Sequence, residues 1–188
     1  LYYSRNGSVE HLANMIARGV AEAGSVARLR TVPAVSPNHV ATEASVPDSG
    51  APFVTKQDLA ECSGLIMGSP TRFGNMAAPM KYFWDNTGAE WASGTLVGKA
   101  AGVFTSSASM HGGQESTLLS MMLPLLHHGC LLVGVPFTES ALSNTQTGGT
   151  PYGASHVSGT DGKKAFSDDE NVIAKALGKR IAQISWKL

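Results

Sequence analysis

The chain has 188 residues, of which 43% are hydrophobic, and its 14 basic and 14 acidic side chains give a formal net charge of zero. This hydrophobic content suits one globular core and excludes a disordered chain, and the zero net charge provides no long-range field that attracts nucleic acid or an anionic membrane. Charged residues make up only 15% of the chain, against roughly 25% in a typical soluble domain, so the surface is either unusually neutral or partly covered by other chains.

The first predicted elements are a strand end and an amphipathic helix. Residues 1–3 (Leu-Tyr-Tyr) look like the end of a strand whose first residues are missing, because the chain opens without a start methionine. Apolar residues then recur at spacings of three and four from Val9 to Val20, which predicts a helix that ends near Gly24. Residues 26–32 predict a short second strand.

A long loop and a short capped helix are expected next. Residues 33–54 contain four prolines and no lysine or arginine, which is typical of a long functional or mobile loop. Thr55 and Asp58 have the spacing of a capping box, in which each side chain hydrogen-bonds the other's backbone N–H. They predict a short helix that runs to Cys62.

The middle of the chain alternates between apolar runs and helical patterns. Residues 65–67 are apolar and bounded by glycines, as in a buried parallel strand. Residues 69–75 predict a loop, and a helix follows from about 78 to 86, with Pro79 in its first turn. Residues 100–104 predict another buried strand.

The last third of the chain contains two more predicted helices and one more strand. A loop of small residues leads into a helix over about 114–128, for which Gly129 is a natural C-cap. Residues 131–135 predict the last strand, and residues 136–162 are rich in Gly, Ser and Thr. Ser167 and Glu170 predict a capping box for the final helix.

The alternation of strand and helix predicts an α/β fold with a parallel sheet and helices on both faces. Five strands and five helices in this length fit a flavodoxin-like three-layer sandwich, a five-stranded parallel sheet in the order 2-1-3-4-5. We expect residues 1–188 to form a single domain with an insertion at about 136–166.

Two kinds of protein are excluded or disfavoured by the remaining residues. The longest apolar runs, 121–126 and 130–137, are far shorter than the ~20 residues of a membrane span. Cys62 and Cys130 lie far apart without the spacing of a metal site, so we expect reduced, buried thiols in a cytoplasmic protein.

The segment after the first strand has the composition of an anion site. Ser4, Arg5, Asn6, Gly7 and Ser8 offer hydroxyls and backbone N–H groups at a helix N-terminus, where the helix dipole and unpaired donors favour a phosphate. A plain strand-to-helix turn with Ser8 as the N-cap is the alternative.

Two more loops follow strands that end at the same edge of the sheet, where ligands bind in such folds. The 70–75 segment combines a rigid turn, a cation, an aromatic ring and an amide, which suits a flat heteroaromatic ligand; a polar turn with a buried Phe73 is the alternative. The 106–113 loop has only small side chains before Met110 and His111, so its backbone can hydrogen-bond a ring edge.

Motifs for other chemistries are absent from the sequence. There is no G-x-G-x-x-G, no G-x-x-x-x-G-K-[ST] and no G-x-S-x-G, so a Rossmann dinucleotide site, a P-loop and a hydrolase elbow are disfavoured. The histidines lack metal-ligand spacing. His127 and His128 are either helix-end residues or ligand contacts, and Trp91 belongs either to the core or to a pocket wall.

Six segments together resemble the WrbA family of flavodoxin-like, FMN-dependent NAD(P)H:quinone oxidoreductases, and the similarity runs along nearly the whole chain. They are Leu-Tyr-Tyr-Ser at 1–4, Ser-Pro-Thr-Arg-Phe-Gly-Asn-Met at 69–76, Trp-Ala-Ser-Gly at 91–94, Gly-Gly-Gln-Glu at 112–115, His-His-Gly at 127–129 and Gly-Gly-Thr-Pro-Tyr-Gly-Ala at 148–154.

The resemblance implies non-covalently bound FMN, a homotetramer, and two-electron reduction of quinones with NADH or NADPH as co-substrate. It places the FMN phosphate on residues 4–9, the isoalloxazine beside residues 71–73 and the 106–112 loop at the ring edge, with His127 reaching the flavin from a neighbouring subunit and Trp91 lining the quinone pocket. The implied cofactor-binding residues are Ser4, Arg5, Asn6, Gly7, Ser8, Val9, Pro70, Thr71, Arg72, Phe73, Gly74, Asn75, Ser106, Ser107, Ala108, Ser109, Met110, His111, Gly112 and His127.

Two positions depart from the family pattern. Asn6 stands where family members often have an aromatic residue that touches the nicotinamide nucleotide, and the 106–113 loop is one residue longer than the common form, with Met110 and His111 in place of small residues.

The implied mechanism is ping-pong: hydride passes from the nicotinamide to flavin N5, NAD(P)⁺ leaves, and a quinone accepts two electrons in the same site. No side chain needs to act as a nucleophile, because the cofactor carries the chemistry. A flavodoxin-type electron carrier and a flavin-free regulatory or scaffold binding protein are the alternatives.

The shortage of charge is concentrated in one segment. Residues 100–162 contain no lysine or arginine, and their only acids are Glu115, Glu139 and Asp161. Since charged residues are depleted at the cores of interfaces, this segment predicts a face that is buried between subunits around the cofactor.

Overall fold

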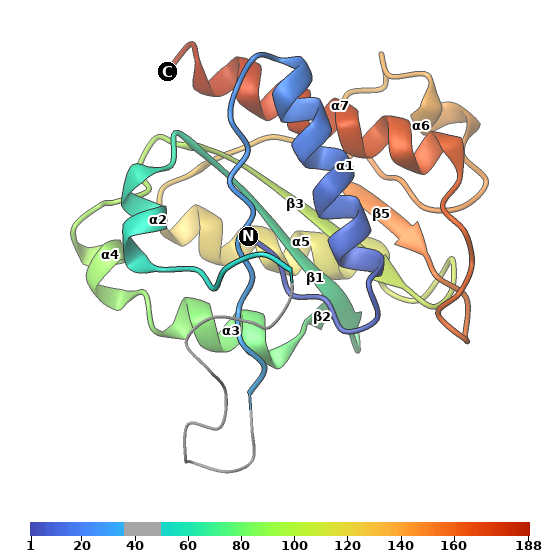
Figure 1. Cartoon of the computed structure of the whole chain (residues 1–188), viewed down its shortest axis with the longest axis horizontal. Helices are drawn as coiled ribbons and strands as arrows, with labels where there is room; N and C mark the ends of the chain where they lie inside the picture. Colours follow the sequence, from blue (N-terminus) through green and yellow to red (C-terminus); the bar gives the residue numbers. More distant parts are fainter. Residues whose placement is uncertain (36–49) are drawn as a thin grey trace.

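The computed structural model describes residues 1–35 and 50–188, and Figure 1 shows their arrangement. Most of the predicted loop at 33–54 therefore lies outside the described residues. The strands are β1 (Gly64–Arg72), β2 (Asn75–Met76), β3 (Ala100–Ser107), β4 (Leu131–Leu132) and β5 (Ala154–Val157). The helices are α1 (Ser8–Glu22), α2 (Lys56–Glu61), α3 (Ala78–Asp85), α4 (Gly88–Ala92), α5 (Gln114–His127), α6 (Ala141–Asn144) and α7 (Asp168–Ser185).

The sheet is mixed, so the prediction of a wholly parallel sheet is wrong. Strand β3 pairs in parallel with β1, β4 and β5, whereas β2 pairs antiparallel with β1. The antiparallel pair arises because Phe73 and Gly74 both adopt positive φ and turn the chain back on itself. Residues 69–72, predicted as loop, therefore continue β1.

Strand β5 was not predicted. It pairs with part of β3 that the strand expected at 131–135 would have paired with. Strand β4 pairs with the start of β3, at Ala100 and Ala101, and covers only two residues. Strand β5 pairs with the other end of β3, from Phe104 to Ser107. The Gly/Ser/Thr-rich segment that contains β5 gave no strand signal, although all four of its residues are buried.

The two segments expected as the first strands form single-residue bridges rather than full strands. Tyr2 bridges in parallel to Thr31 on one side and to Gly68 on the other, with Tyr2 N–H donating to Arg30 O and Tyr3 N–H donating to Gly68 O, both at 2.9 Å. The pairing around these segments leaves the strand order 2-1-3-4-5 a prediction.

The five longer helices match the prediction closely, and both predicted capping boxes are confirmed. The Thr55 side chain and the Asp58 side chain cap each other's backbone at α2, and Ser167 and Glu170 do the same at α7. Gly129 follows α5 with φ 77°, as expected of a helix C-cap. The short helices α4 and α6 were not predicted.

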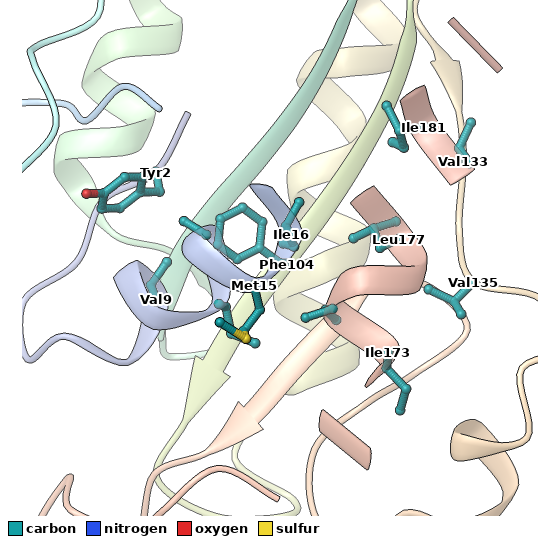
Figure 2. Packing of buried hydrophobic residues seen from close by; sticks show 14 of the residues in the cluster. Tyr2, Val9, Met15, Ile16, Phe104, Val133, Val135, Ile173, Leu177 and Ile181 are labelled. Atoms are coloured by element: carbon teal, nitrogen blue, oxygen red, sulfur yellow. The ribbon is translucent and has the colours of Figure 1, made fainter. Parts of the chain in front are cut away.

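Helices α1 and α7 cover one face of the sheet, and α3 and α5 cover the other (Figure 1). Figure 2 shows Phe104 of β3 among side chains of α1, with Ile173 and Leu177 of α7 in the same cluster. The two helices approach closely because Gly19 and Gly178 lie at their crossing: a Cβ on Gly19 would lie 1.9 Å from Lys175 O. Within the described residues, no helix is long and apolar enough to cross a membrane.

Candidate functional site

A cleft of about 290 Å³ opens at the carboxyl ends of β1, β3 and β5, beside the N-terminus of α1. Four segments line it, and three of them are the loops that the sequence singled out. The lining residues are Ser4, Arg5, Asn6, Ser8, Val9, Pro70, Thr71, Arg72, Ser106, Ser107, Ala108, Gly112, Ser158, Gly159, Thr160, Asp161 and Gly162.

The first wall is the turn into α1. Gly7 is the N-cap, with φ 87° and no side chain to cap the helix, so the alternative of Ser8 as the N-cap is wrong. Ser4 Oγ accepts a hydrogen bond from Glu10 N–H at 3.3 Å. The earlier N–H groups of the first turn have no intrahelical acceptors, as at any helix N-terminus. No atom of the described residues lies within 4 Å of a Cβ built on Gly7, so the backbone here has room for a ligand.

The second wall is the end of β1 and the hairpin that follows it. Thr71 Oγ1 lies 2.6 Å from Thr117 Oγ1 of α5, and Ser120 Oγ donates to Asn75 Oδ1 at 3.1 Å, so α5 holds both arms of the hairpin. Phe73 at the tip is fully exposed and has φ 52°. The alternative of a buried Phe73 is therefore wrong, and Phe73, Gly74 and Asn75 lie outside the cleft lining.

The third wall is the end of β3 and the loop into α5. Ser106, Ser107, Ala108 and Gly112 line the cleft, whereas Ser109, Met110 and His111 do not. The loop is braced from within, because Ser107 Oγ donates to Ser109 O at 2.8 Å and Gln114 Nε2 donates to Met110 O at 3.1 Å. The buried Gln114 Oε1 has no hydrogen-bond partner among residues 1–35 and 50–188.

The fourth wall, residues 158–162, was missed by the sequence analysis. Ser158 directly follows β5 and is tied to the third wall, since its N–H and its Oγ donate to Ser107 O at 2.8 and 3.1 Å. The available signal was a polar loop with Gly159, Asp161 and Gly162, but it could not be placed at the cleft while β5 was unrecognised.

Trp91 and His127 lie together but away from the cleft. Trp91 Nε1 donates to His127 O at 2.8 Å, and both residues are exposed. His127 ends α5, whose 14 residues place it about 20 Å from the helix N-terminus that adjoins the cleft. Neither residue can contact a ligand in the cleft of its own chain.

His128 is a structural residue, which separates the roles of the two adjacent histidines. It is buried against Trp84, with Nε2 at 2.9 Å from Thr87 Oγ1. Burial lowers the pKa of its imidazole. His128 therefore remains a packed helix-end residue, and only His127 is free to face another molecule.

A larger cavity of about 510 Å³ opens at the opposite edge of the sheet, near the start of β1 and the end of α7. Its lining includes Ala13 and Ile16 of α1, Arg28, Asp58 and Trp186. None of the predicted binding residues lines it, so it is not the predicted site.

The cleft residues fit the two chemical parts of FMN. An uncapped helix N-terminus with an open Gly7 and the nearby Arg5 suits a phosphate dianion. The serine and threonine hydroxyls around it suit a polyol chain and a polar ring edge. Within residues 1–35 and 50–188, no cluster of His, Cys, Asp or Glu could hold a metal ion.

The fold and the cleft define a flavodoxin-like α/β protein with a polar cleft at the carboxyl ends of its strands. The chain belongs to the NADPH-dependent FMN reductase family, whose pattern it matches over residues 3–138. It is 46% identical to an NAD(P)H dehydrogenase (quinone) of Chromohalobacter salexigens and 44% identical to one of Gluconacetobacter diazotrophicus; each alignment covers all of this chain and 96% of the relative.

Two solved structures support the fold. A WrbA-like flavodoxin protein from Agrobacterium tumefaciens has a TM-score of 0.68 at 22% identity, covering 99% of this chain and 94% of that one. A flavodoxin from the domain Archaea has a TM-score of 0.62 at 17% identity, covering 98% and 96%. The relatives and these structures together confirm the predicted family resemblance and the flavodoxin-like fold class.

Proposed function

We propose that this protein is an FMN-dependent NAD(P)H:quinone oxidoreductase that reduces quinones to quinols by two electrons. The comparisons bear out the predicted cofactor and reaction, because the family is that of FMN reductases and the full-length relatives are named NAD(P)H dehydrogenase (quinone). The observation that carries the proposal is the convergence of the three predicted FMN segments on one cleft.

In this proposal the three walls divide the work of holding FMN. The backbone N–H groups of Gly7, Ser8 and Val9 bind the phosphate at the α1 N-terminus, with Arg5 adding a positive charge. Thr71, Arg72 and Phe73 flank the isoalloxazine, and the exposed, strained Phe73 is free to cover a ring face. Ser106 to Gly112 supply backbone and hydroxyl groups to the ring edge.

When bound, FMN would supply the redox chemistry, carrying the two electrons and one proton of the NAD(P)H hydride to the quinone, with the second proton of the quinol taken from solvent. The chain's own groups bind and orient the reactants. We propose ping-pong turnover, in which NAD(P)⁺ leaves before the quinone enters the same open site. Initial-rate plots with NADH and benzoquinone are expected to give parallel lines; intersecting lines would contradict this order.

We also propose a homotetramer in which His127 and Trp91 complete a neighbouring subunit's site. Their distance from the cleft of their own chain supports this arrangement. The outer face of α5 carries exposed Leu119, Leu123 and Leu126 along its length, and an antiparallel pair of α5 helices would bring each His127 toward the other chain's cleft. This face lies within the segment that lacks lysine and arginine.

The assembly is tested by a charge placed in the apolar face. Leu123→Glu is expected to dissociate the tetramer on size exclusion with light scattering at micromolar concentration. Val172→Glu is the matched control, because Val172 is similarly exposed but lies on α7. A wild-type protein that is monomeric with FMN bound would overturn this part of the proposal.

The finer points of the architecture belong to the same proposal. Residues 1–188 form one flavodoxin-like domain with an insertion at about 136–166. The strand order is 2-1-3-4-5 when the five strands expected from the sequence are numbered along the chain, which differs from the numbering of β1 to β5. The bridges of Tyr2 to Thr31 and to Gly68 support it, because they place residues 1–3 between residues 26–32 and β1. A cytoplasmic location fits the two cysteines, which are free thiols.

The function is tested by reconstitution with FMN followed by an assay of NADH-dependent benzoquinone reduction. We expect a yellow, stoichiometric complex that oxidises NADH over many turnovers when a quinone is present. Protein that stays colourless after FMN is added would overturn the proposal and favour a flavin-free binding protein. A flavin complex that passes single electrons to a protein partner but does not oxidise NADH would favour an electron carrier.

A further inference from the structure

Glu170 is a buried carboxylate that the proposed reaction does not use. It is the third residue of α7 and is 1% exposed. Its Oε2 accepts hydrogen bonds from Ser167 N–H at 2.9 Å and from His156 Nδ1 at 3.0 Å. Its Oε1 accepts from Gly148 N–H at 2.9 Å and from Val157 N–H at 3.1 Å. Because a carboxylate only accepts, the His156 proton lies on Nδ1.

These four donors are more than a helix cap needs. A capping box uses one N3 carboxylate to satisfy the N-cap N–H, which here is the Ser167 bond. The other three donors belong to β5 and to the turn before it. Glu170 therefore fastens the first turn of α7 to both ends of the segment that leads into the fourth wall of the cleft.

The start of the fourth wall is hydrogen-bonded both to Glu170 and to the third wall. Val157, whose N–H Glu170 accepts, is the last residue of β5, and the next residue, Ser158, donates twice to Ser107 O. Lys164 N–H donates to Ser158 O at 2.9 Å and closes the loop. Residues 158–162 between these bonds line the cleft.

The chain that leaves the wall is held by an aromatic stack that includes the same histidine. The Phe166 ring lies between His156, at 3.7 Å between ring centroids, and His11 of α1, at 3.9 Å. His11 Nε2 lies 3.1 Å from Asn171 Oδ1 of α7. The stack joins the chain after the wall to the first turns of α1 and α7, so the Glu170–His156 pair lies where the wall and these two helices meet.

We propose that Glu170 is a positioning residue of the cofactor cleft, which holds residues 158–162 against Ser107 so that this wall faces the bound FMN. The ligand in this inference rests on the proposed function, whereas the anchoring of the wall does not. The wall offers the Ser158 and Thr160 hydroxyls and the Asp161 carboxylate, groups that suit the hydroxyls of the ribityl chain rather than its phosphate.

The other capping box of the chain provides a matched control. Asp58 occupies the same third position in α2, but among the described residues it accepts only from Thr55 and Arg30. Asp58→Asn therefore removes an equivalent carboxylate without touching the cleft. Ser167→Ala is a second control, because it removes the α7 cap to Glu170 N–H while keeping the carboxylate and its other partners.

The test compares Glu170→Gln with these two controls in two measurements. The first is the FMN dissociation constant, from quenching of flavin fluorescence. The second is the rate of tryptic cleavage after Lys163 and Lys164 in protein without FMN. We expect E170Q to weaken FMN binding about tenfold and to speed this cleavage, while D58N and S167A stay within about twofold of wild type.

The two measurements separate this inference from the proposed function. If wild-type protein does not bind FMN, the proposed function fails, and the cleavage rates still decide whether Glu170 anchors the wall. If folded E170Q matches wild type in both measurements, or if D58N changes them as much, the inference is overturned.

A second variant covers the case in which E170Q does not fold. Ser158→Ala removes the bond from Ser158 Oγ to Ser107 O at the other end of the wall. We expect it to weaken FMN about threefold and to speed the same cleavage; unchanged values would show that the wall is not held at the cleft by these anchors.

Discussion

Two cavities in the described part of this protein lie at opposite edges of one sheet and are built from different parts of the chain. The larger, about 510 Å³, is lined mainly by the flanks of α1 and α7 and by segments near the start of β1. The smaller, about 290 Å³, is lined by loops that follow β1, β3 and β5 and by the turn into α1. Of these two, only the smaller is lined by predicted binding residues.

The difference shows that the direction of the strands, and not the volume of a cavity, indicates where the candidate binding site lies. Every parallel strand delivers its following loop to the same edge, so polar groups from distant parts of the chain meet there. At that edge α1 also presents its N-terminus, where N–H groups are unpaired. At the other edge the same helix presents an apolar flank, and the charged side chains of that lining are paired with one another, Arg28 with Glu61 and Arg30 with Asp58.

The first way to sharpen this comparison is the pH dependence of the two capping carboxylates, one beside each cavity. Burial works to raise the pKa of Glu170, but the hydrogen bonds from His156, Ser167 and Gly148 outweigh it and lower the pKa to about 2. Because the pKa is lower in the folded chain, the ionised carboxylate stabilises the fold above pH 4.5, and this stabilisation is lost as the pH falls toward 2.

The ionised Glu170 is expected to contribute about 3 kcal/mol to the free energy of unfolding at pH 7, of which about 2 kcal/mol is lost by pH 3. Urea unfolding of wild type and E170Q at both pH values measures it as the change in their stability difference. The partly exposed Asp58, whose pKa is lowered by Thr55 and Arg30 against the opposing effect of burial, is expected to show a smaller change in D58N. If the stability differences of E170Q and D58N from wild type changed equally between pH 7 and pH 3, the two carboxylates would not differ as proposed.

The second test places a charge in the smaller cavity's anion site. Gly7 and Gly98 both have positive φ, and nothing lies within 4 Å of a Cβ on either. Aspartate and asparagine tolerate this conformation. We expect G7D to weaken FMN binding about 100-fold through repulsion of the phosphate and G7N about tenfold, while G98D stays within about twofold.

Fluorescence titration with FMN checks this series. A G7D variant that binds no worse than G7N would show that charge at the α1 N-terminus is irrelevant. The phosphate would then have to lie elsewhere in the cleft.

The third test compares an exposed tryptophan from each region. Trp91 is 56% exposed beside His127, and Trp186 is 62% exposed at the rim of the larger cavity. We expect W91A to lower kcat/KM for benzoquinone about tenfold with an unchanged FMN dissociation constant, because its place is in the proposed quinone pocket of a neighbouring subunit. W186A is expected to stay within about twofold, and a loss as large as that of W91A would break the comparison.

How much the sequence predicts depends on whether a feature is local. The α1 periodicity and both capping boxes depend on residues three or four positions apart, and the structure has them where they were expected. The convergence of the 4–9, 70–72 and 106–112 segments was also predictable, because it follows from strand direction alone.

The features that the sequence did not predict depend on contacts distant in the chain. Strand β5 is four residues within a Gly-rich segment, and it forms because β3 has a free edge from Phe104 to Ser107. The fourth wall depends on that pairing and on Glu170. The exposure of Phe73 depends on the hairpin being held by Thr117 and Ser120 of α5, which no local pattern of the 69–76 segment reveals.

The smallest expected effect compares an arginine at the rim of each cavity. Arg28 pairs with Glu61 at 2.8 Å, but both side chains are largely exposed, so R28A is expected to change stability by less than about 0.5 kcal/mol and FMN binding not at all. Arg5, also exposed, lines the smaller cavity, and R5A is expected to weaken FMN about threefold at low salt. Because salt screens exposed charges, this difference should shrink between 20 and 300 mM NaCl, roughly the range over which the Debye length falls from about 20 to about 6 Å. A salt-independent loss in R5A would mean that Arg5 acts by packing rather than by charge.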